Sequence, residues 1–492
     1  MKVPPPGRAA ATAMAASTVA PPMQAGSPLS LGHAIALILG VAIGAGIFKA
    51  PSMVAAHVPS VGWLFAVWIA GGFFSIIGAL CYAELSTTYP SQGGEYHFLS
   101  RAFGRGTALL YGWARFAVIG TGSIALLGFL FGDYMAQLMP LGPHGPALYA
   151  AAAVLLLTAL NVRGLREGVR AQAWLTSLDV AGLVLIVGAG AWFWWAGGAD
   201  ALAASSAAAN AGPPPSAGAA TQAGVPLSLA GIGMAMVFVL LTFGGWNDAA
   251  YISADLPHRR AIAWALLLSV GLITVLYLLV NWAYWATLGL DGMASADAVA
   301  ADMLALSLGP FAGHLIAVMV SVAALASMNA TLIVGARTAC ALGRDWPALR
   351  LLGTCCPRRQ VPRNSYFAQG ALALALIALG AFYDDGFTAM VEYTAPVFWL
   401  FLFLTGVALF RLRRLEPQLQ RPFRVPLYPW VPLIFCGSSL GMLWASLAFV
   451  GSHQVAGVNA AWVGVAVLAS GLLLMRLMGR SPTRAQLPDT PA

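Results

Sequence analysis

Charged residues are scarce in this chain, and their scarcity excludes a water-soluble globular domain. Only 9% of the 492 residues are charged and 60% are apolar, whereas a soluble domain carries about 25% charged residues. We therefore predict an all-α polytopic membrane protein. In lipid, helices satisfy their own backbone hydrogen-bonding groups.

Cysteine is rare, and motifs of common membrane enzymes and pumps are missing. Cys81, Cys340 and Cys436 fall in apolar segments, with Cys355 and Cys356 in a loop, so no disulfide framework is expected. The seven histidines are scattered, and neither HExxH nor a lysine-containing phosphate-binding loop occurs. These absences argue against a membrane-embedded enzyme or an ATP-driven pump, and no metal or cofactor is expected.

What the chain has instead is a series of apolar segments near the length of about 20 residues that a membrane-spanning helix needs. We predict twelve transmembrane helices. They lie at 31–56, 61–87, 107–138, 147–162, 171–197, 226–254, 261–289, 310–341, 364–383, 387–411, 427–450 and 456–478. The fourth is short, and 107–138 is long enough to hide a tilt or a kink.

The positions of the basic residues support this count. With a cytoplasmic N-terminus, every Lys and Arg except Lys49, Arg115 and Arg337 falls in an inner segment, and the outer loops contain none. This is the positive-inside rule, so the net charge of +8 reflects topology and no nucleic-acid partner is expected. Arginine outnumbers lysine 23 to 2, which suggests a GC-rich bacterial genome and a bacterial cytoplasmic (inner) membrane, with both termini in the cytoplasm.

Composition also divides the chain into regions. The first is rich in Pro and Ala and predicts disorder, and another contains three consecutive prolines. The predicted regions are a cytoplasmic tail (1–27), a first repeat of five helices (28–197), an outer loop (198–225), a second repeat of five helices (226–411), helices 11 and 12 (412–478) and a cytoplasmic tail (479–492).

Glycines interrupt the first and the sixth apolar segments, at Ile43–Phe48 and Phe243–Asn247. An unwound backbone at membrane depth is tolerated only where protein buries it or a polar cavity adjoins it. A pair of such breaks in corresponding positions of two halves is typical of the substrate site of an inverted-repeat transporter. Because five crossings separate the breaks, they are antiparallel, as a five-plus-five repeat requires. Ordinary close-packing glycines are the alternative.

The backbone groups at the two breaks suit an amino acid zwitterion. The outer half of the first helix begins near Gly46 and directs free N–H groups and the positive end of its dipole at the midplane, which favours a carboxylate. The carbonyls at the end of the inner half-helix, and those from Leu241 to Gly244, can accept hydrogen bonds from an ammonium group.

Five motifs follow one another along the chain: Gly-Ala-Gly-Ile-Phe at 44–48, Tyr-Ala-Glu-Leu at 82–85 with Gly-Gly-Glu-Tyr at 93–96, Phe-Gly-Gly-Trp-Asn at 243–247, Ser-Met-Asn at 327–329 with Gly-Ala-Arg at 335–337, and Arg-Pro-Phe-Arg-Val-Pro-Leu-Tyr-Pro at 421–429. In this order they resemble the amino acid–polyamine–organocation superfamily, most of all its bacterial L-type amino acid transporter branch. The resemblance covers residues 31–450. It implies a leucine-transporter-type fold with discontinuous helices 1 and 6, and amino acid exchange or proton symport by alternating access.

The resemblance also implies where the head group of the substrate binds. The carboxylate would lie on the N–H groups of Ala45 and Gly46, beside Gly44, and the ammonium on the carbonyls of Ala42, Leu241 and Gly244. Relatives often have serine at the position of Ala45, so one hydroxyl donor is absent here.

Three more side chains are candidates for the binding site. Relatives often have an aromatic gate at the position of Leu241, so the lid here is aliphatic or is supplied by Phe243. Asn247 follows the second break. Asn329 would line the cavity, or it would form a hydrogen bond between helices.

Charges at membrane depth are candidates for coupling or gating. Asp179 lies mid-span where many relatives resemble one another in having lysine, and a carboxylate there costs several kcal/mol unless it is paired, protonated or hydrated. In a functional role, Asp179 would titrate or bind a cation. Otherwise it would be a neutral Asp that is hydrogen-bonded to a nearby Ser or Thr, or it would lie closer to the cytoplasmic interface.

Asp248 is expected to cap the inner half of helix 6, with substrate contact as the alternative. Glu84 and Arg337 would form an inner gate or orient loops, and Lys49 is expected to extend to outer water or to attract anionic groups.

Other functions stay open at this point. Asp179 and Asp248 would suit a polyamine or cationic amino acid carrier, and a channel would leave the antiparallel breaks without a purpose. The expected partners are a small amino acid substrate, the lipid bilayer and protons as a candidate coupling ion, with no obligate protein partner.

Overall fold

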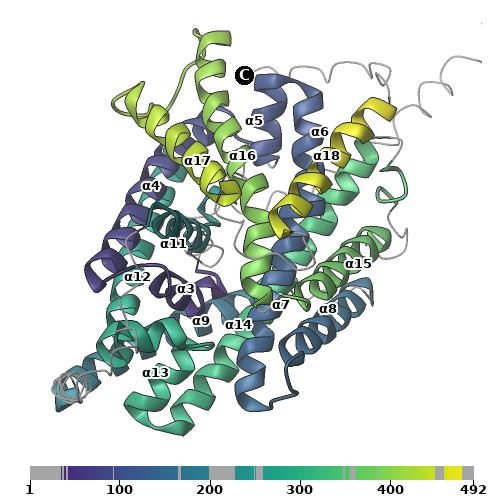
Figure 1. The fold of residues 1–492 in the computed structure, drawn as a ribbon. Helices are drawn as coiled ribbons and strands as arrows, with labels where there is room; N and C mark the ends of the chain where they lie inside the picture. The colour runs from purple at the N-terminus through teal and green to yellow at the C-terminus, as the bar shows by residue number, and fades with distance from the viewer. Residues whose placement is uncertain are drawn as a thin grey trace, which may run out of the picture.

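The computed structural model describes residues 35, 38–39, 43–91, 93–163, 168–198, 228–248, 250, 259–346, 349–354, 362–383, 385–448 and 459–478. Within these ranges the secondary structure is helical and no strand occurs (Figure 1), which confirms the all-α prediction. The predicted tails and nearly all of the 198–225 loop lie outside the described residues, as do Cys355 and Cys356.

Nine helices in the described ranges are long and apolar enough to cross a membrane. They are α4 (Val61–Thr88), the continuous run of α6 (Arg105–Ala114), η2 (Arg115–Gly120) and α7 (Thr121–Leu138), α8 (Gly145–Arg163), α9 (Gly168–Phe193) with η3 (Trp194–Gly198), α11 (Leu229–Thr242) together with the turn that follows it to Asp248, α12 (Arg259–Ser295), α14 (Pro310–Asp345), α16 (Gly386–Leu415) and α17 (Trp430–Ala448).

Further helices coincide with the other predicted spans. These are η1 (Ala45–Phe48) with α3 (Ala50–Ala55), α15 (Arg363–Gly380) and α18 (Ala460–Met478). Two short helices, α5 (Gly94–Phe103) and α13 (Val299–Leu308), lie between predicted spans. The total of twelve spans stays a prediction.

The long segment 107–138 contains a local change of helix type. Its middle, η2, is a π-helical stretch that continues directly into α7. A π-bulge widens one turn and is frequent at functional sites. Here it begins at Arg115, whose side chain reaches the second helix break, as described below.

Helices α4 and α12 pack against each other in antiparallel directions. The rings of Phe65 and Trp285 are 6.3 Å apart, and those of Trp68 and Tyr277 are 5.7 Å apart, so residue numbers rise along one helix as they fall along the other. Helix α3 also packs on α11, α7 on α14 and α8 on α15. These contacts surround the two broken segments.

The two ends of the helix bundle differ in charge. We call the end with α5 and the α16–α17 connection the basic end, since Arg101, Arg413 and Arg421 lie there, and the end with α13 the acidic end, since it carries Asp297 and Asp302 (Figure 1).

Candidate substrate site at the two helix breaks

The first break is a segment without α-helical hydrogen bonding. Gly44 is extended (φ −85°, ψ 171°), η1 is a 3-10 turn, and α3 starts only after Lys49. No side chain caps η1, and the first N–H groups of a helix have no acceptor within it. The N–H groups of Ala45 and Gly46 can therefore stabilise an anion placed beside them.

The second break ends α11 in a turn. Helix α11 stops at Thr242, Gly244 N donates to the carbonyl of Leu241 at 3.0 Å, and Gly245 has a φ of +100°. That φ lies in the left-handed region, which glycine adopts without steric cost. The carbonyl of Leu241 accepts one hydrogen bond within the turn, and a carbonyl oxygen has a second lone pair for a ligand.

The two breaks lie next to each other, and each is held by a tyrosine from a neighbouring helix. A methyl group at Gly46 would be 3.5 Å from Thr242 Oγ1. The Tyr134 hydroxyl in α7 donates to the carbonyl of Phe48 at 2.7 Å, and that of Tyr277 in α12 donates to the carbonyl of Thr242 at 3.3 Å. Both rings are fully buried, so the backbone is fixed in its unwound form on either side.

The structure gives Phe243 a buried place in an aromatic cluster. Its ring centroid lies 6.0 Å from that of Trp68 and 5.1 Å from that of Tyr277, and its side chain is 1% exposed. Leu241 is only partly buried. Whether either residue covers a substrate stays a prediction.

Asn247 forms a hydrogen bond with a buried carboxylate near the basic end. Glu95, in α5, is 4% exposed. It accepts hydrogen bonds from the hydroxyls of Tyr82 and Tyr111, and one from Asn247 Nδ2 at 3.2 Å. Glu95 belongs to the Gly-Gly-Glu-Tyr motif at 93–96, but no role was expected for it. Its effect is to tie the second break to α4, α5 and α6.

Asp248 forms an ion pair. Arg115 Nη2, at the start of η2, lies 2.8 Å from Asp248 Oδ1. Residues 249 and 251–258 lie outside the described residues, so the helix cap expected from Asp248 stays a prediction.

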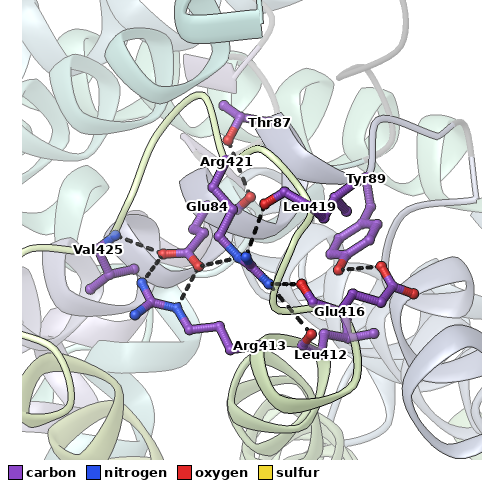
Figure 2. Close-up of polar contacts among 9 residues, drawn as sticks. All are labelled: Glu84, Thr87, Tyr89, Leu412, Arg413, Glu416, Leu419, Arg421 and Val425. Atoms are coloured by element: carbon purple, nitrogen blue, oxygen red, sulfur yellow. Dashed lines mark hydrogen bonds and ion pairs between the residues drawn. The ribbon is translucent and has the colours of Figure 1, made fainter. Parts of the chain in front are cut away.

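Glu84 lies at the centre of a polar network at the basic end, drawn in Figure 2. Its carboxylate is 2% exposed. It accepts a hydrogen bond from Arg413 Nε at 2.7 Å, a second from the same guanidinium, and one from the backbone N–H of Val425 at 2.7 Å. Arg421 Nε is 3.5 Å away.

This network explains two of the quoted motifs. The carboxylate of the 82–85 motif binds residues of the 421–429 motif, and Arg421 also donates to carbonyls at the end of α16, those of Glu416 and Leu412. Cations are favourable at a helix C-terminus. Glu84 contacts Val425 in the α16–α17 connection, and whether it belongs to an inner gate or orients this loop stays a prediction. Arg337, its expected companion, is exposed on α14 and is not among the partners that the structure shows for Glu84.

A second carboxylate extends the network toward water. Glu416 binds Arg101 Nε at 2.8 Å and the hydroxyl of Tyr89 at 2.9 Å. Partial burial raises the pKa of Glu416, but the hydrogen bonds from Arg101 and Tyr89 outweigh it and leave that pKa below its usual value. Burial, followed by the bond to Glu416, raises the pKa of Tyr89 to about 12.

Asn329 forms a hydrogen bond between helices. Asn161 Nδ2 in α8 donates to Asn329 Oδ1 in α14 at 2.7 Å, which was the alternative to a cavity-lining amide. Ala42 and the side chain of Asp179 lie outside the described residues, so their expected roles stay predictions.

The expectation that Lys49 extends to outer water is wrong. The residue is 3% exposed, its Nζ lies 3.0 Å from Asp133 Oδ2, and it donates to the carbonyl of Asp297 at 3.1 Å. The carboxylate of Asp133, inside the protein, takes the place of the water that would otherwise solvate the ammonium group of Lys49. Asp133 was not predicted as a site residue, although it is the single carboxylate in the apolar segment 107–138.

A small pocket adjoins the second break on the side of α17. Its lining includes Gly244, Asn247, Ser75, Trp399 and Ser439. Ser439 belongs to a Gly-x-Ser-x-Gly sequence at 437–441. It lies inside α17, without the strand-to-helix turn that makes such a serine a nucleophile.

Comparison with known proteins agrees with this geometry. Residues 29–469 match the family described as amino acid permease. The chain is 29% identical to the mouse b(0,+)-type amino acid transporter 1 over 419 residues, which cover 84% of this chain and 81% of the relative. It is 26% identical to the human Asc-type amino acid transporter 1 over 454 residues, covering 90% and 80%. It is 24% identical to the human cystine/glutamate transporter over 424 residues, covering 85% and 80%.

These relatives are transporters and not enzymes, and the family match spans most of the chain, broken helices included. The chain therefore belongs to the amino acid permease family of the amino acid–polyamine–organocation superfamily, and it is a multi-pass membrane protein that transports amino acids.

Proposed function

We propose that the chain is a secondary active transporter that carries neutral, zwitterionic amino acids by alternating access, as an exchanger or a proton symporter. The observation that carries the proposal is that the two breaks lie next to each other, since a Cβ added at Gly46 would lie 3.5 Å from Thr242 Oγ1. It supports one site with N–H donors on one side and carbonyl acceptors on the other. Such a pair of broken helices at a repeat interface is the arrangement in which transporters bind small charged substrates.

In this proposal the backbone binds the head group. The substrate carboxylate lies on the N–H groups of Ala45 and Gly46, and the ammonium on the carbonyls of Ala42, Leu241 and Gly244. Backbone recognition is independent of the substrate's side chain, so one head-group site serves several amino acids. One relative, the cystine/glutamate transporter, is named for two different amino acids, which supports a site of this kind.

The packing of the helices supports the five-plus-five repeat. Under that repeat, α3, α4, α7 and α8 correspond to α11, α12, α14 and α15, and each helix packs against its counterpart. An inverted repeat relates its halves by a two-fold axis in the membrane plane, which places corresponding helices near the axis in antiparallel contact. We place the protein, with both termini in the cytoplasm, in a bacterial inner membrane.

The charges favour a neutral substrate over a cationic one. Asp248, which would suit a polyamine or cationic amino acid carrier, is neutralised by Arg115 at 2.8 Å. Asp179 is the remaining candidate for proton coupling. We expect Asp179→Asn to leave exchange intact and to flatten the pH dependence of net uptake, and an unchanged pH profile would remove it from the coupling mechanism.

The proposal is tested by reconstitution in liposomes. Labelled amino acids and polyamines are offered with and without a pH gradient and with amino acids trapped inside. Saturable uptake of neutral amino acids is expected: uptake that needs trapped substrate identifies an exchanger, and strict dependence on the gradient identifies proton symport. Uptake of polyamines alone, or of no amine, would overturn the proposal.

A pair of glycine variants tests the site itself. Gly46→Leu fills the space beside Thr242, so we expect uptake to fall by about tenfold or more, which equals a loss of about 1.4 kcal/mol of binding. Gly437→Leu is the matched control, because Gly437 is exposed on α17 with no atom within 4 Å of an added Cβ. Equal uptake by both variants would contradict the proposed site.

A further inference from the structure

Glu95 is a buried carboxylate that is connected to the second helix break through a single side chain. It lies in α5, between two predicted spans, and is 4% exposed. Its Oε1 accepts a hydrogen bond from Asn247 Nδ2 at 3.2 Å, and Asn247 Oδ1 accepts one from the backbone N–H of Gly245 at 3.2 Å. The amide of Asn247, itself 3% exposed, therefore links the charge of Glu95 to the backbone of the break.

This link reaches an acceptor proposed for the ammonium group of the substrate. The N–H of Gly245 and the carbonyl of Gly244 belong to the same peptide group, and a peptide group is planar. A hydrogen bond that holds the N–H therefore also fixes the direction in which the carbonyl of Gly244 points.

Hydrogen-bond donors and two charges surround Glu95. The hydroxyls of Tyr82 in α4 and Tyr111 in α6 donate to its carboxylate. Arg115, at the start of η2, and Asp248 are the charged groups that act on it. Burial raises the pKa of Glu95 above its ordinary value, and Arg115 and the two hydroxyls offset only part of that rise.

Helix α16, which also packs against α5, presents an apolar ring near Glu95. Its Phe401 lies beside Tyr111, with the ring centroids 5.2 Å apart. The charged and titratable side chains in which α5 and α16 meet are grouped toward the C-terminal end of α5: Arg101 bound to Glu416, His97 near this pair, and Arg411 over the ring of Phe103. Arg115 and Asp248 are thus the charges that set the protonation of Glu95.

Protonation of Glu95 would weaken its link to the break. A hydrogen bond to a charged acceptor is about twice as strong as one between neutral groups. A tyrosine hydroxyl can turn and accept a proton from a carboxylic acid, whereas the amino group of the Asn247 amide can only donate. The bond from Asn247 therefore loses strength when Glu95 binds a proton, and the peptide group between Gly244 and Gly245 is held less firmly.

We propose that Glu95 is a proton-binding positioning residue of the substrate site: its carboxylate, through Asn247, holds the carbonyl of Gly244 in place for the substrate's ammonium group, and protonation lowers the affinity for substrate. The inference rests on the head-group site proposed above. It is separate from coupling by Asp179, because it concerns affinity at equal pH on both sides of the membrane and not uptake driven by a gradient.

The role is tested by the pH dependence of KM in exchange. The protein is reconstituted in liposomes that contain a neutral amino acid, with the same pH on both sides. Uptake of the labelled amino acid is measured from about pH 5 to 8, above the ordinary carboxyl pKa of about 4.3. In the parent protein, KM should rise about tenfold as the pH falls, with a smaller change in the maximal rate. Glu95→Gln, which cannot titrate, should have a raised KM at every pH.

Two outcomes of this experiment would overturn the positioning role. One is a parent KM that does not vary with pH, and the other is a Glu95→Gln variant with the pH profile of the parent. No saturable uptake by the parent at any pH would instead contradict the proposed function.

Tyr111→Phe tests the carboxyl group without replacing it. The variant removes one hydrogen bond to the charged form of Glu95, so the midpoint of the KM profile should move to higher pH by about one unit, the size expected for one bond to a charged group. A hydroxyl with only a structural role would not move this midpoint. An unchanged midpoint, or one at lower pH, would contradict the inference even where Glu95→Gln does not fold.

Glu416→Gln is the matched control. Glu416 is also a carboxylate at the basic end that binds a tyrosine hydroxyl and an arginine, but these partners, Tyr89 and Arg101, lie at the end of α4 and on α5. Its KM profile should equal that of the parent. If the profile were as flat as the one expected for Glu95→Gln, the pH dependence would not belong to Glu95.

Discussion

Among single residues, Glu84 has the largest predicted effect on stability. It is 2% exposed and binds Arg413 and Val425 directly, with Arg421 close by. Removing one partner of a buried ion pair costs about 3–5 kcal/mol, because the remaining charges stay buried without compensation. We expect Glu84→Gln to lower the midpoint of thermal unfolding markedly in purified, detergent-solubilised protein.

Glu416→Gln is the control for this prediction. The Arg101–Glu416 pair is 45% and 27% exposed, and exposed pairs contribute about 0–1 kcal/mol. Because its pKa is lowered in the folded protein, Glu416 stabilises the fold above the ordinary carboxyl pKa of about 4.3 and loses that effect as the pH falls through its folded pKa. Similar midpoints for the two variants at neutral pH would contradict the role given to Glu84.

At the scale of elements, the close contact between α7 and α8 depends on Gly132. A methyl group there would lie 2.2 Å from the carbonyl oxygen of Pro146. That atom belongs to the backbone, so the helices themselves would have to separate. Overpacking costs about 1–3 kcal/mol, and we expect Gly132→Ala to lower the thermal midpoint and the uptake rate, since Asp133 and Tyr134 follow it in α7.

Gly441→Ala provides the comparison, because nothing lies within 4 Å of a Cβ at Gly441 in α17. We expect a change of less than about 0.5 kcal/mol there. If Gly132→Ala were as stable and as active as Gly441→Ala, the helices would pack less tightly than the structure indicates.

The elements themselves were largely predictable, because hydropathy over about 20 residues reports which segments satisfy their backbone in lipid. Helices α4, α8, α16 and α17 fall where the apolar segments predict them. The elements that the sequence did not predict are short. Helices α5 and α13 have only ten residues each, too short for that signal, and the π-helical η2 has no signature in the composition of its segment.

At the scale of the whole molecule, the charge asymmetry predicts which end faces the cytoplasm. Ser295, at the acidic end of α12, and Thr354, near the basic end of α14, are both exposed. In intact cells, an impermeant thiol reagent should label Ser295→Cys, and Thr354→Cys only after the membrane is opened. Labelling of both from outside, or the reverse order, would contradict the predicted topology and the count of spans between these residues.

By itself, the sequence determined the class of the protein, the positions of its apolar helices and of the two glycine breaks, and the family to which the protein belongs. Each of these properties depends on a continuous stretch of chain, through its hydropathy or through a sequence motif. Only the tertiary structure decided the partners of the charged residues: Lys49 with Asp133, Arg115 with Asp248 and Glu84 with Arg413. The physical reason is that a buried charge needs a partner, yet hydropathy records only that the charge is there. Which partner it meets depends on how helices far apart in the chain pack together.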